Sequence, residues 1–337
     1  MTRTTRMSRT TRITGAPEKG TVMKAVTITD FGAEPLLTDL PMPEPGPGEL
    51  LVRLRAAALN PFDWKVADGA LKGAVEHGFP LVLGSDGAGV VERIGPGVIH
   101  FRPGDTVYGQ FMNLPYGRGS YAEYVLAAES GTVARIPDDL PFPVAAALPT
   151  ASVTAYQAIE AARLDTGHVI LINGASGSVG QSAIQFATLQ GARVLATATG
   201  DIAGHLRDLG ADETIDFTAA PTAEQVLAAH PEGIDSVLDL VTPPGADIDA
   251  LAGLLKPGGT LVSTNRAAGP DILAAREIHG VNLVNDPSRK ELESLAALAD
   301  AGKLRITIDA EVPLADAPAA VARARAGGSR GKTVILL

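Results

Sequence analysis

The segment of residues 173–180 reads Asn-Gly-Ala-Ser-Gly-Ser-Val-Gly, a pattern suited to binding a phosphate. It follows an almost continuous apolar run, His168–Asn173, and it opens the segment Gly177–Gln190, whose apolar residues fall near one helical face. The glycines allow a tight turn, a close approach of the backbone to a pyrophosphate, and close packing of helix against strand. Free N–H groups at the start of the helix would face the phosphates.

The spacing of these glycines is GxxGxxG rather than GxGxxG, so a tight βα turn that binds nothing is the alternative interpretation. The strand–helix–strand context favours a dinucleotide cofactor. The residues of the turn that we expect to bind it are Gly174, Ala175, Ser176, Gly177, Ser178, Val179 and Gly180.

The end of the next predicted strand, Arg193–Thr199, indicates which dinucleotide binds. NAD-binding proteins usually place an acidic residue there for the ribose hydroxyls, whereas NADP-binding proteins avoid that charge. Here Thr197 and Thr199 offer hydroxyls to a 2′-phosphate, and the first acid, Asp201, already lies in the loop. Asp201 would repel a phosphate if it pointed inward, so cations from elsewhere are expected. NADPH is therefore the predicted cofactor, with positive charge from Arg330, Lys332 or His205.

Two sequence patterns divide the chain that must position this turn. From Lys24 to about Pro143, short β runs broken by Gly and Pro are typical of a mostly antiparallel β domain. After Pro149, strands alternate with helices, which predicts right-handed crossovers and a doubly wound parallel sheet. The predicted strands are residues 24–28, 49–59, 88–95, 105–109, 120–127, 168–173, 193–199, 213–217, 236–240, 259–264 and 332–337. The predicted helices are residues 177–190, 201–209, 223–229 and 291–301.

Composition excludes several classes of function. With 337 residues, of which 45% are apolar, the chain can bury a sizeable core and suggests two domains. A net charge of −10 and an aromatic share of 4% argue against nucleic-acid binding. Because the chain has no cysteine, it cannot form disulfides or thiolate metal sites. Its apolar runs are far shorter than the roughly 20 residues of a membrane span, so we expect a soluble, cytoplasmic protein.

Residues 1–22 differ from the rest of the chain. They carry four arginines and one lysine against a single acid, a net charge of +4. Such an Arg-rich, Ser/Thr-rich segment is also typical of transit peptides, so targeting is one interpretation, whereas a secretory signal would need an apolar region. We interpret these residues as a disordered N-terminal tail.

Several further segments carry patterns that occur together in one protein family. They are Ala58–Lys65, Gly84–Val91, Phe101–Val107, Gly119–Tyr124, Ala147–Pro149, Thr154–Tyr156 and Gly331–Val334. Over about residues 23–337 the chain resembles the medium-chain dehydrogenase/reductases, in their zinc-free quinone oxidoreductase-like branch. The resemblance implies an α/β protein with a GroES-like β-rich catalytic domain, residues 23–143 completed by 286–337, and a Rossmann cofactor-binding domain, residues 144–285. It also implies an active-site cleft between the domains and a homodimer.

Zinc-dependent members of this family hold the metal with a Cys near the Asn-Pro position and a His-Glu pair in the later Gly-rich segment. Here those places read Asn60-Pro61-Phe62-Asp63 and Gly84-Ser85-Asp86, and the six histidines show no ligand spacing. We therefore expect no metal. Without a Lewis acid, alcohol oxidation loses its usual way of stabilising an alkoxide. A quinone or a conjugated double bond is an acceptor that is already activated, so its reduction depends less on a Lewis acid.

The resemblance also implies roles for individual residues. The candidate catalytic residues are Asn60, Asp63 and Lys65. The Lys65 ammonium and the Asn60 amide would donate hydrogen bonds to a developing enolate oxygen, and Asp63 would orient Lys65 or a ribose hydroxyl. The alternatives are a simple turn at Asn60 and an exposed surface lysine. The residues expected near the nicotinamide or at the carboxyl edge of the sheet are Thr150, Thr154, Leu240, Val241 and Ser263.

The sequence offers two sources for the proton. Tyr108, Tyr116 and Tyr121 are candidate proton donors, although tyrosines in a β domain are more often packing residues. Water is the other candidate, and in that case no side chain need be essential.

The predicted function is an NADPH-dependent, zinc-independent reductase that transfers hydride to a quinone or to the C=C bond of an α,β-unsaturated carbonyl. A short-chain dehydrogenase would need Tyr-x-x-x-Lys, and none of the five tyrosines has a lysine four residues on. Two alternatives stay open, a trans-acting enoyl reductase on an acyl thioester and a non-catalytic NADPH-binding sensor. The expected partner is a small-molecule substrate, not nucleic acid or a membrane.

Overall fold

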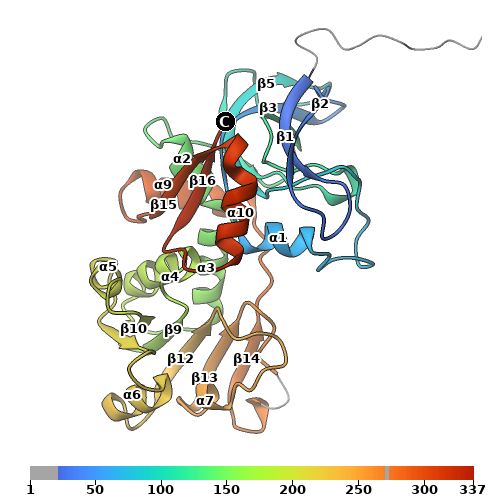
Figure 1. Ribbon diagram of the computed structural model, residues 1–337. Coiled ribbons are helices and arrows are strands. Elements are labelled where there is room, and N and C mark those ends of the chain that lie inside the picture. Colours follow the sequence, from blue (N-terminus) through green and yellow to red (C-terminus); the bar gives the residue numbers. More distant parts are fainter. Residues whose placement is uncertain (1–21, 270–272) are drawn as a thin grey trace, which may run out of the picture.

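The short β runs of the first half of the chain form a β-rich domain, in the upper part of Figure 1. The structure, a computed structural model, describes residues 22–269 and 273–337. The larger sheet has seven strands in the order β15-β16-β3-β5-β6-β8, with β7 also paired to β3. Their bounds are β15 Ile308–Pro313, β16 Lys332–Leu336, β3 Glu49–Ala58, β5 Asp86–Ile94, β6 Thr106–Gln110, β8 Val133–Arg135 and β7 Tyr124–Ala128. A smaller sheet has the order β2-β1-β4, with bounds Leu36–Pro41, Val22–Ile28 and Leu81–Val82.

The end of the chain returns to this first domain. Strand β16 pairs with β3 antiparallel and with β15 parallel, so the C-terminal segment completes the larger sheet. The other described pairs of the two sheets are antiparallel, as predicted for this half of the chain. Helices α1 (Pro61–Ala67) and α10 (Ala317–Arg325) pack beside one another in this domain.

The second domain is a parallel sheet with helices on both faces, as the alternating pattern predicts. Its six strands have the order β11-β10-β9-β12-β13-β14, and each neighbouring pair is parallel. Their bounds are Glu213–Asp216, Arg193–Ala198, Val169–Asn173, Ile234–Asp239, Leu255–Ser263 and His279–Asn282. The helices that follow these strands are α4 Ser178–Leu189, α5 Ala203–Asp208, α6 Thr222–Ala229 and α7 Asp249–Ala252. This strand order, 3-2-1-4-5-6, is that of a Rossmann domain.

Strand β9 shows why its sequence is apolar without interruption. Ile170 and Ile172 point into the core formed with α4 and α5, whereas Leu171 points into the core formed with α6 and α7. A strand covered on both faces has no residue that benefits from being polar.

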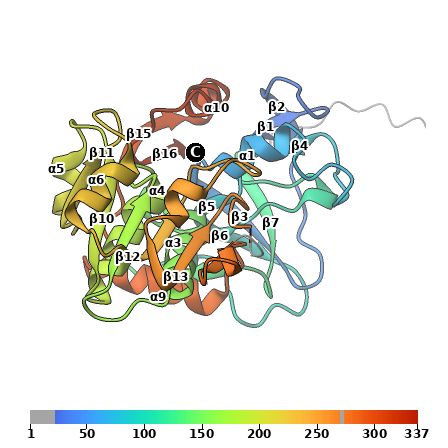
Figure 2. The same cartoon turned by 90° about the horizontal axis from the view of Figure 1, so that it is seen from below.

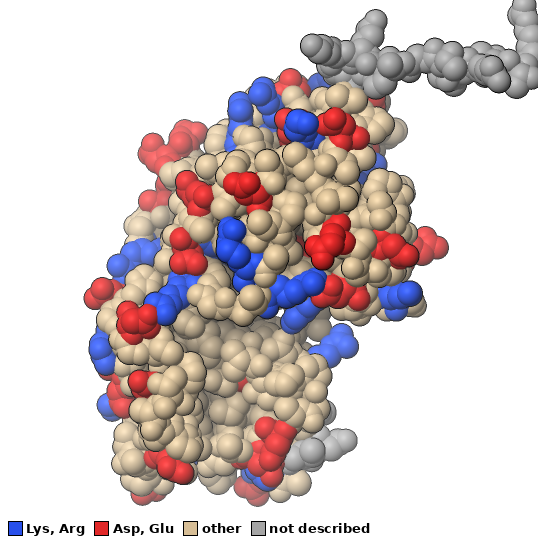
Figure 3. Space-filling model, in the orientation of Figure 1, with Lys and Arg blue, Asp and Glu red and all other residues tan. Residues whose placement is uncertain are grey.

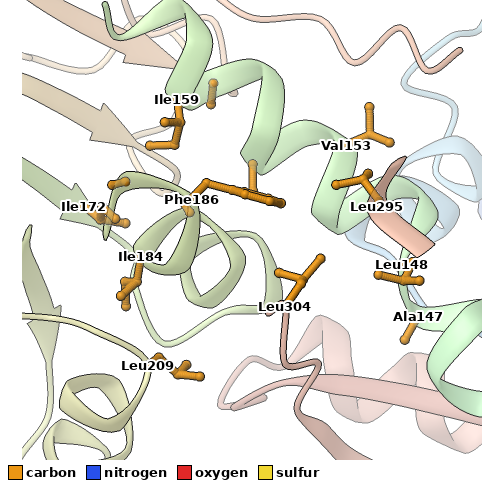
Figure 4. Close-up of a cluster of buried hydrophobic side chains, with 14 of the residues drawn as sticks. Ala147, Leu148, Val153, Ile159, Ile172, Ile184, Phe186, Leu209, Leu295 and Leu304 are labelled. Atoms are coloured by element: carbon orange, nitrogen blue, oxygen red, sulfur yellow. The ribbon is translucent and has the colours of Figure 1, made fainter. Parts of the chain in front are cut away.

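The larger of these cores also joins the two domains. It contains Ala58, Ala88 and Tyr108 of the β-rich domain together with Ile170 and Ile172. Helix α3 (Pro149–Ala161) lies between the parallel sheet and the β-rich domain in both views (Figures 1 and 2). Figure 4 shows part of this core, with labelled side chains that include Ala147, Leu148, Val153, Ile159, Ile184, Phe186, Leu295 and Leu304. Continuous packing of this kind positions the elements around the domain junction.

Most predicted elements coincide with observed ones, and the differences follow from context. The strand expected over residues 120–127 begins only at Tyr124, after backbone that bonds to β1 and to the segment before β5. Several observed elements were not predicted, among them strands β2, β14 and β15 and helices α1, α3 and α10. The predicted tail, apart from residue 22, lies outside the described residues. No helix in the described ranges is long and apolar enough to cross a membrane.

Candidate functional site

The Gly-rich turn connects β9 to α4 at the carboxyl edge of the parallel sheet. Gly174 has φ +94°, and a Cβ there would lie 2.7 Å from the Val241 Cγ1, so the fold itself requires this glycine. A Cβ on Gly180 would lie 2.5 Å from the Ala175 Cα, so it would push α4 away from the turn. Gly177 differs, because its Cβ would meet only the Gly174 carbonyl oxygen, at 3.7 Å. The open space at Gly177 is what a closely bound pyrophosphate requires.

The start of α4 offers unpaired donors beside this space. The helix begins at Ser178, with Gly177 as its N-cap residue and no side-chain cap. The N–H groups of its first turn, which include those of Val179 and Gly180, lack intrahelical acceptors. Ser176 and Ser178 are partly exposed. These residues lie together as predicted, in an arrangement that attracts anions.

Thr197 supports the turn and does not face a ligand. Its buried hydroxyl accepts a hydrogen bond from the Gly174 N–H at 2.9 Å and donates to the Ile172 carbonyl at 3.4 Å. The expectation that Thr197 contacts a 2′-phosphate is therefore corrected, because the side chain points into the sheet. Thr199 lies beyond the end of β10, where its hydroxyl donates to Asp201 Oδ1 at 2.8 Å.

A cation also lies at the end of β10. The Arg330 guanidinium, from the loop before β16, forms an ion pair with Asp201, and both side chains are about half exposed. The hydrogen bond from Thr199, followed by the Arg330 guanidinium, lowers the pKa of Asp201 below its usual range. Arg330 thus offsets the charge of Asp201 and sits where a 2′-phosphate is expected.

The other two cations considered for this position lie elsewhere. Lys332 is buried, its ammonium donates to Asn60 Oδ1 at 2.5 Å, and it lies 3.7 Å from Asp86 Oδ2. The expectation that Lys332 supplies positive charge to a 2′-phosphate is corrected. Strand β16 lies between two other strands, and this side chain points into the protein. The His205 Nε2 lies 3.0 Å from Gln181 Oε1 and 3.1 Å from the hydroxyl of Thr307, which precedes β15.

Asn60 is buried, and its side-chain amide is used inside the protein. Its side-chain nitrogen donates to Asp86 Oδ2 at 2.9 Å and to the Ala58 carbonyl at 3.3 Å, while its oxygen accepts from Lys332. The residue is only 2% exposed. Both amide N–H groups are used inside the protein, which corrects the expectation that Asn60 stabilises an enolate.

Asp63 is likewise saturated in the interior. Its Oδ1 accepts from the N–H and the hydroxyl of Ser85, at 2.9 and 3.0 Å. Its Oδ2 accepts from the Tyr121 hydroxyl at 2.7 Å and the Asn60 N–H at 2.8 Å. The expectation that Asp63 orients Lys65 or a ribose hydroxyl is therefore corrected, because both carboxylate oxygens are used inside the protein. Burial raises its pKa to about 6, against the opposing effect of these hydrogen bonds.

Of the three tyrosines considered as proton donors, two are buried and one is exposed. Tyr121 is fully buried behind Asp63, and burial raises its pKa well above 10. The Tyr108 hydroxyl donates to the Leu292 carbonyl in the core. Tyr116 is 70% exposed, under the guanidinium of Arg118. Their positions favour the packing interpretation.

The buried carboxyl of Asp63 should make stability depend on pH. Because its pKa rises from 3.8 to about 6, ionising it costs more in the folded than in the unfolded chain. The free energy of unfolding of the wild type, relative to that of Asp63→Asn, should therefore fall by roughly 3 kcal/mol between about pH 4 and 6 and level off above about 7. Urea unfolding of both proteins across this range measures the difference. If the difference in the free energy of unfolding between the two proteins did not vary with pH, the pKa of Asp63 would not be raised in the folded protein.

Lys65 is the exposed member of the three candidate catalytic residues. Its ammonium donates to Asn265 Oδ1 at 3.4 Å, which joins α1 to the segment after β13. The Asn265 side chain in turn donates to the Leu240 carbonyl at 3.0 Å, and Val241 is 55% exposed. Residues from both domains thus meet at the carboxyl edge of the sheet. Asn265 lies two residues beyond Ser263, in the segment that the sequence places at the carboxyl edge of the sheet.

Ser263 itself shapes the loop. Its buried hydroxyl accepts from the N–H groups of Asn265 and Ala267, at 3.2 and 3.1 Å. The predicted contact between Ser263 and the cofactor is corrected to this indirect role, since the oxygen is already used by the backbone.

Thr150 and Thr154 lie at the start of α3, where the two domains meet. The Thr150 hydroxyl donates to Asp86 Oδ1 at 2.6 Å and accepts from Gln110 Nε2 at 2.9 Å. The Thr154 hydroxyl donates to the Thr150 carbonyl at 2.6 Å and accepts from Asn285 Nδ2 at 2.7 Å. Gln110 and Asn285 were not predicted, because a single amide residue has no characteristic spacing.

Two buried oxygens at this junction are Asp239 Oδ2 and Asn285 Oδ1. Neither has a hydrogen-bond partner among the described residues. Asp239 ends β12, and its other oxygen accepts from Asn173 Nδ2 and the Thr242 hydroxyl, both at 2.9 Å. A buried acceptor without a donor costs about 1–3 kcal/mol. The hydroxyl and amide donors of a nicotinamide riboside could meet this need. Together with the space at Gly177, the residues present fit a dinucleotide.

The charge distribution around the domain junction agrees with an anionic ligand. In Figure 3, lysine and arginine side chains gather across the waist, where the surface between the domains is hollowed. The chain as a whole carries a net charge of −10. A local cationic region on an acidic protein would attract a phosphate-bearing ligand to this position.

The residues present do not fit a zinc ion. Within residues 22–269 and 273–337, no group of three or more His, Cys, Asp or Glu side chains could hold a metal. The positions that correspond to zinc ligands in relatives carry Asn60, Asp63, Ser85 and Asp86. Their polar atoms are bonded to each other and to neighbouring residues, as described above.

Two family models match the chain. The alcohol dehydrogenase GroES-like domain matches residues 46–138, and a model described as zinc-binding dehydrogenase matches residues 209–335. The first lies in the β-rich domain, and the second spans the later part of the parallel-sheet domain and the C-terminal segment that returns to the β-rich sheet. The second description names a metal that the residues of this chain do not fit.

Individual relatives match over almost the whole chain. A chloroplastic quinone-oxidoreductase of Triphysaria versicolor is 32% identical, covering 94% of this chain and 99% of its own length. A 2-methylene-furan-3-one reductase of Solanum lycopersicum is 33% identical, covering 86% of this chain and 72% of its own length. The solved structure of a quinone oxidoreductase from Coxiella burnetii superposes with TM-score 0.84 at 32% identity, covering 94% of this chain and 99% of that one. Because one relative is named as chloroplastic, the predicted cytoplasmic location stays a prediction. The chain belongs to the medium-chain dehydrogenase/reductase family, among its quinone oxidoreductase-like members.

Proposed function

We propose that this protein is an NADPH-dependent reductase that transfers a hydride to a quinone or to the C=C bond of an α,β-unsaturated carbonyl. The observation that carries this proposal is that Lys65, from the other domain, bonds to Asn265 at the same edge of the parallel sheet that carries the open Gly-rich turn. The turn is suited to a pyrophosphate, and the lysine is suited to an oxygen that becomes negative. Ligands bind at this edge in folds of this class.

Different parts of the site would hold different parts of the cofactor. The N–H groups of residues 178–180 would bind the pyrophosphate beside Gly177, and Thr199 with Arg330 would bind the 2′-phosphate. The nicotinamide end would lie near Thr150 and Thr154, with Leu240 and Val241 on the side of the sheet. When bound, the reduced nicotinamide supplies the hydride.

Lys65 would act on the acceptor. Reduction of an enone or a quinone places negative charge on the acceptor oxygen, and the Lys65 ammonium would donate a hydrogen bond to that oxygen. Such a donor lowers the barrier because it binds the transition state more strongly than the substrate. Asn265 accepts a hydrogen bond from Lys65 and so would orient the ammonium. We propose water as the source of the proton, since the tyrosines considered above lie elsewhere.

The names of the relatives support both acceptor classes. One is named as a quinone-oxidoreductase and another as a 2-methylene-furan-3-one reductase. The identities of 32% and 33% leave the acceptor pocket free to differ, so both classes belong in the first assay.

The direct test is a binding titration followed by turnover. NADPH and NADH are titrated separately while the emission of Trp64, the single tryptophan of the chain, is recorded. A quinone and an enone are then added, and oxidation of the cofactor is followed. Tighter binding of NADPH with turnover of either acceptor supports the proposal. Binding without turnover would favour an acyl-thioester substrate or a sensor, and binding of neither nucleotide would overturn the proposal.

The preference for NADPH should depend on Arg330. Replacing it by serine removes the cation at the end of β10 and leaves Asp201 to repel a phosphate. We expect the ratio of kcat/KM for NADPH to that for NADH to fall by about tenfold to a hundredfold, because a charge-assisted contact contributes about 1.5–3 kcal/mol. Steady-state kinetics with both cofactors measures this ratio.

The opposite change provides a second arm of this test. Asp201→Asn removes the competitor for Arg330, so it should raise the preference for NADPH. Arg323→Ser, on an exposed residue of α10, removes an arginine elsewhere and should leave the ratio unchanged. If Arg330→Ser and Arg323→Ser behaved alike, Arg330 would not contact the cofactor.

A further inference from the structure

Three charged side chains lie buried together at the domain junction. Lys332 is 2% exposed, and Asp63 and Asp86 are not exposed at all. Burial lowers the pKa of Lys332 and raises that of Asp86, and in each case the opposite charge of the other residue works against the shift. Replacing a buried ion pair by apolar residues is often neutral or stabilising, so stability alone does not account for this group.

One branch of this group leads to Lys65. The Lys332 ammonium fixes the oxygen of the Asn60 side chain, and it also lies 3.5 Å from the Leu59 carbonyl. Asn60 is the N-cap residue of α1, and its backbone N–H is held by Asp63. Helix α1 is short and carries Trp64 and Lys65 in its second half. The orientation of Lys65 toward Asn265 therefore depends on how the start of α1 is held.

The other branch leads to α3. Helix α3 has no side-chain cap of its own, and Asp86 from β5 replaces one. The Asp86 carboxylate accepts from the Thr150 N–H at 3.0 Å and from the Thr150 hydroxyl at 2.6 Å. A carboxylate at a helix start binds its free N–H groups and favours its dipole. Asp86 also accepts from Asn60, so both branches meet at one carboxylate.

We propose that Lys332 is a positioning residue, which acts through Asn60 and Asp86 to hold α1 and the start of α3 in one fixed relation across the domain junction. In this arrangement a single ammonium sets the position of Lys65 relative to Thr150. The effect on turnover rests on the proposed function, but the effect on α1 does not. Misplacement by about 1 Å at a reacting centre can lower a rate by about a hundredfold.

Trp64 allows α1 to be observed without any ligand, because it is the single tryptophan of the chain and neighbours Lys65. The variants are Lys332→Met, which removes the ammonium, Lys332→Arg, which retains a cation, and Asp86→Asn/Lys332→Met. The double variant keeps the experiment interpretable if an unpaired Asp86 prevents folding. We expect Lys332→Met and the double variant to show red-shifted Trp64 emission and faster quenching by acrylamide, with Lys332→Arg closer to wild type.

Kinetics adds a second readout. We expect kcat with NADPH and the best acceptor to fall by about tenfold to a hundredfold in the variants without the ammonium, while KM for NADPH changes by less than about threefold. Lys256→Met is the matched control, since it removes another ion-paired lysine, 2.8 Å from Asp235 at the far end of the parallel sheet. It should alter neither Trp64 nor kcat.

The two readouts separate the two proposals. Folded variants whose Trp64 emission and quenching match wild type would overturn the positioning role, whatever the activity. A change at Trp64 without measurable turnover in any protein, wild type included, would support the positioning role and count against the proposed function. A change at Trp64 that Lys256→Met reproduces would also overturn the proposal, because any lost ion pair would then have the same effect.

Discussion

Replacing Lys65 by methionine is expected to lower kcat/KM for both acceptor classes by about a hundredfold, as happens when one donor to a developing oxyanion is removed. The ammonium is the exposed cation that reaches from α1 to the carboxyl edge of the sheet, where it contacts Asn265. Because the hydrogen bond would strengthen only as charge develops, kcat should fall more than KM rises. NADPH affinity, measured by titration of Trp64 emission, should change little.

Two comparisons make this result specific. Lys72→Met removes an exposed lysine of the same domain that lies over the Phe31 ring at 5.4 Å, and it should retain full activity. Lys65→Arg should retain part of the activity, because a cationic donor remains. If Lys65→Met kept the wild-type kcat/KM for quinone and enone alike, Lys65 would be a surface lysine and the mechanism proposed above would be wrong.

Gly177→Ser should separate cofactor binding from folding. The added Cβ meets only the Gly174 oxygen, at 3.7 Å, and the backbone at Gly177 (φ −75°, ψ 165°) suits a serine N-cap. Thermal stability should therefore stay equal or rise. The serine side chain would fill the space expected for the pyrophosphate, and its hydroxyl would accept from the N–H groups that the pyrophosphate would otherwise use. The NADPH dissociation constant should therefore rise by about tenfold to a hundredfold, or about 1.4–2.8 kcal/mol. Thermal unfolding and a fluorescence titration measure the two effects.

Other glycines provide the controls for this prediction. Gly204→Ser adds a side chain on α5 with nothing within 4 Å and should leave affinity unchanged. Gly180→Ala should reduce both stability and affinity, because its Cβ would lie 2.5 Å from the Ala175 Cα. Unchanged NADPH affinity in Gly177→Ser would mean that no phosphate approaches this turn.

The parallel sheet and its Gly-rich turn could be predicted because their signals are local. The apolar run at β9, the helical spacing of α4 and the glycines between them lie within residues 168–190. Strand β15 and helix α10 gave weaker signals. Strand β15 alternates partly buried and exposed residues over only six positions at the edge of its sheet. Helix α10 is rich in alanine, so its sequence shows little difference in hydrophobicity between the two faces of the helix.

The individual site residues were harder to predict, and the reason is burial. Asn60, Asp63 and Lys65 lie within six residues of each other, yet two are saturated in the interior and one is exposed. Arg330 and Lys332 are two residues apart, but Arg330 lies in a loop beside Asp201, whereas Lys332 enters β16 and turns inward. Hydrogen bonds such as Lys65 to Asn265 join residues 200 positions apart.

By itself, the sequence determined the class of each domain, the position of the Gly-rich turn and the family, because these depend on residue types at short spacing. Only the tertiary structure decided which polar residues face the cleft and which hold it together. That division depends on which strands pair and which side chains lose contact with water, and both are properties of segments that meet in space from distant parts of the chain. Lys65 and Lys332 are the clearest cases, since the first lysine is exposed and the second is buried.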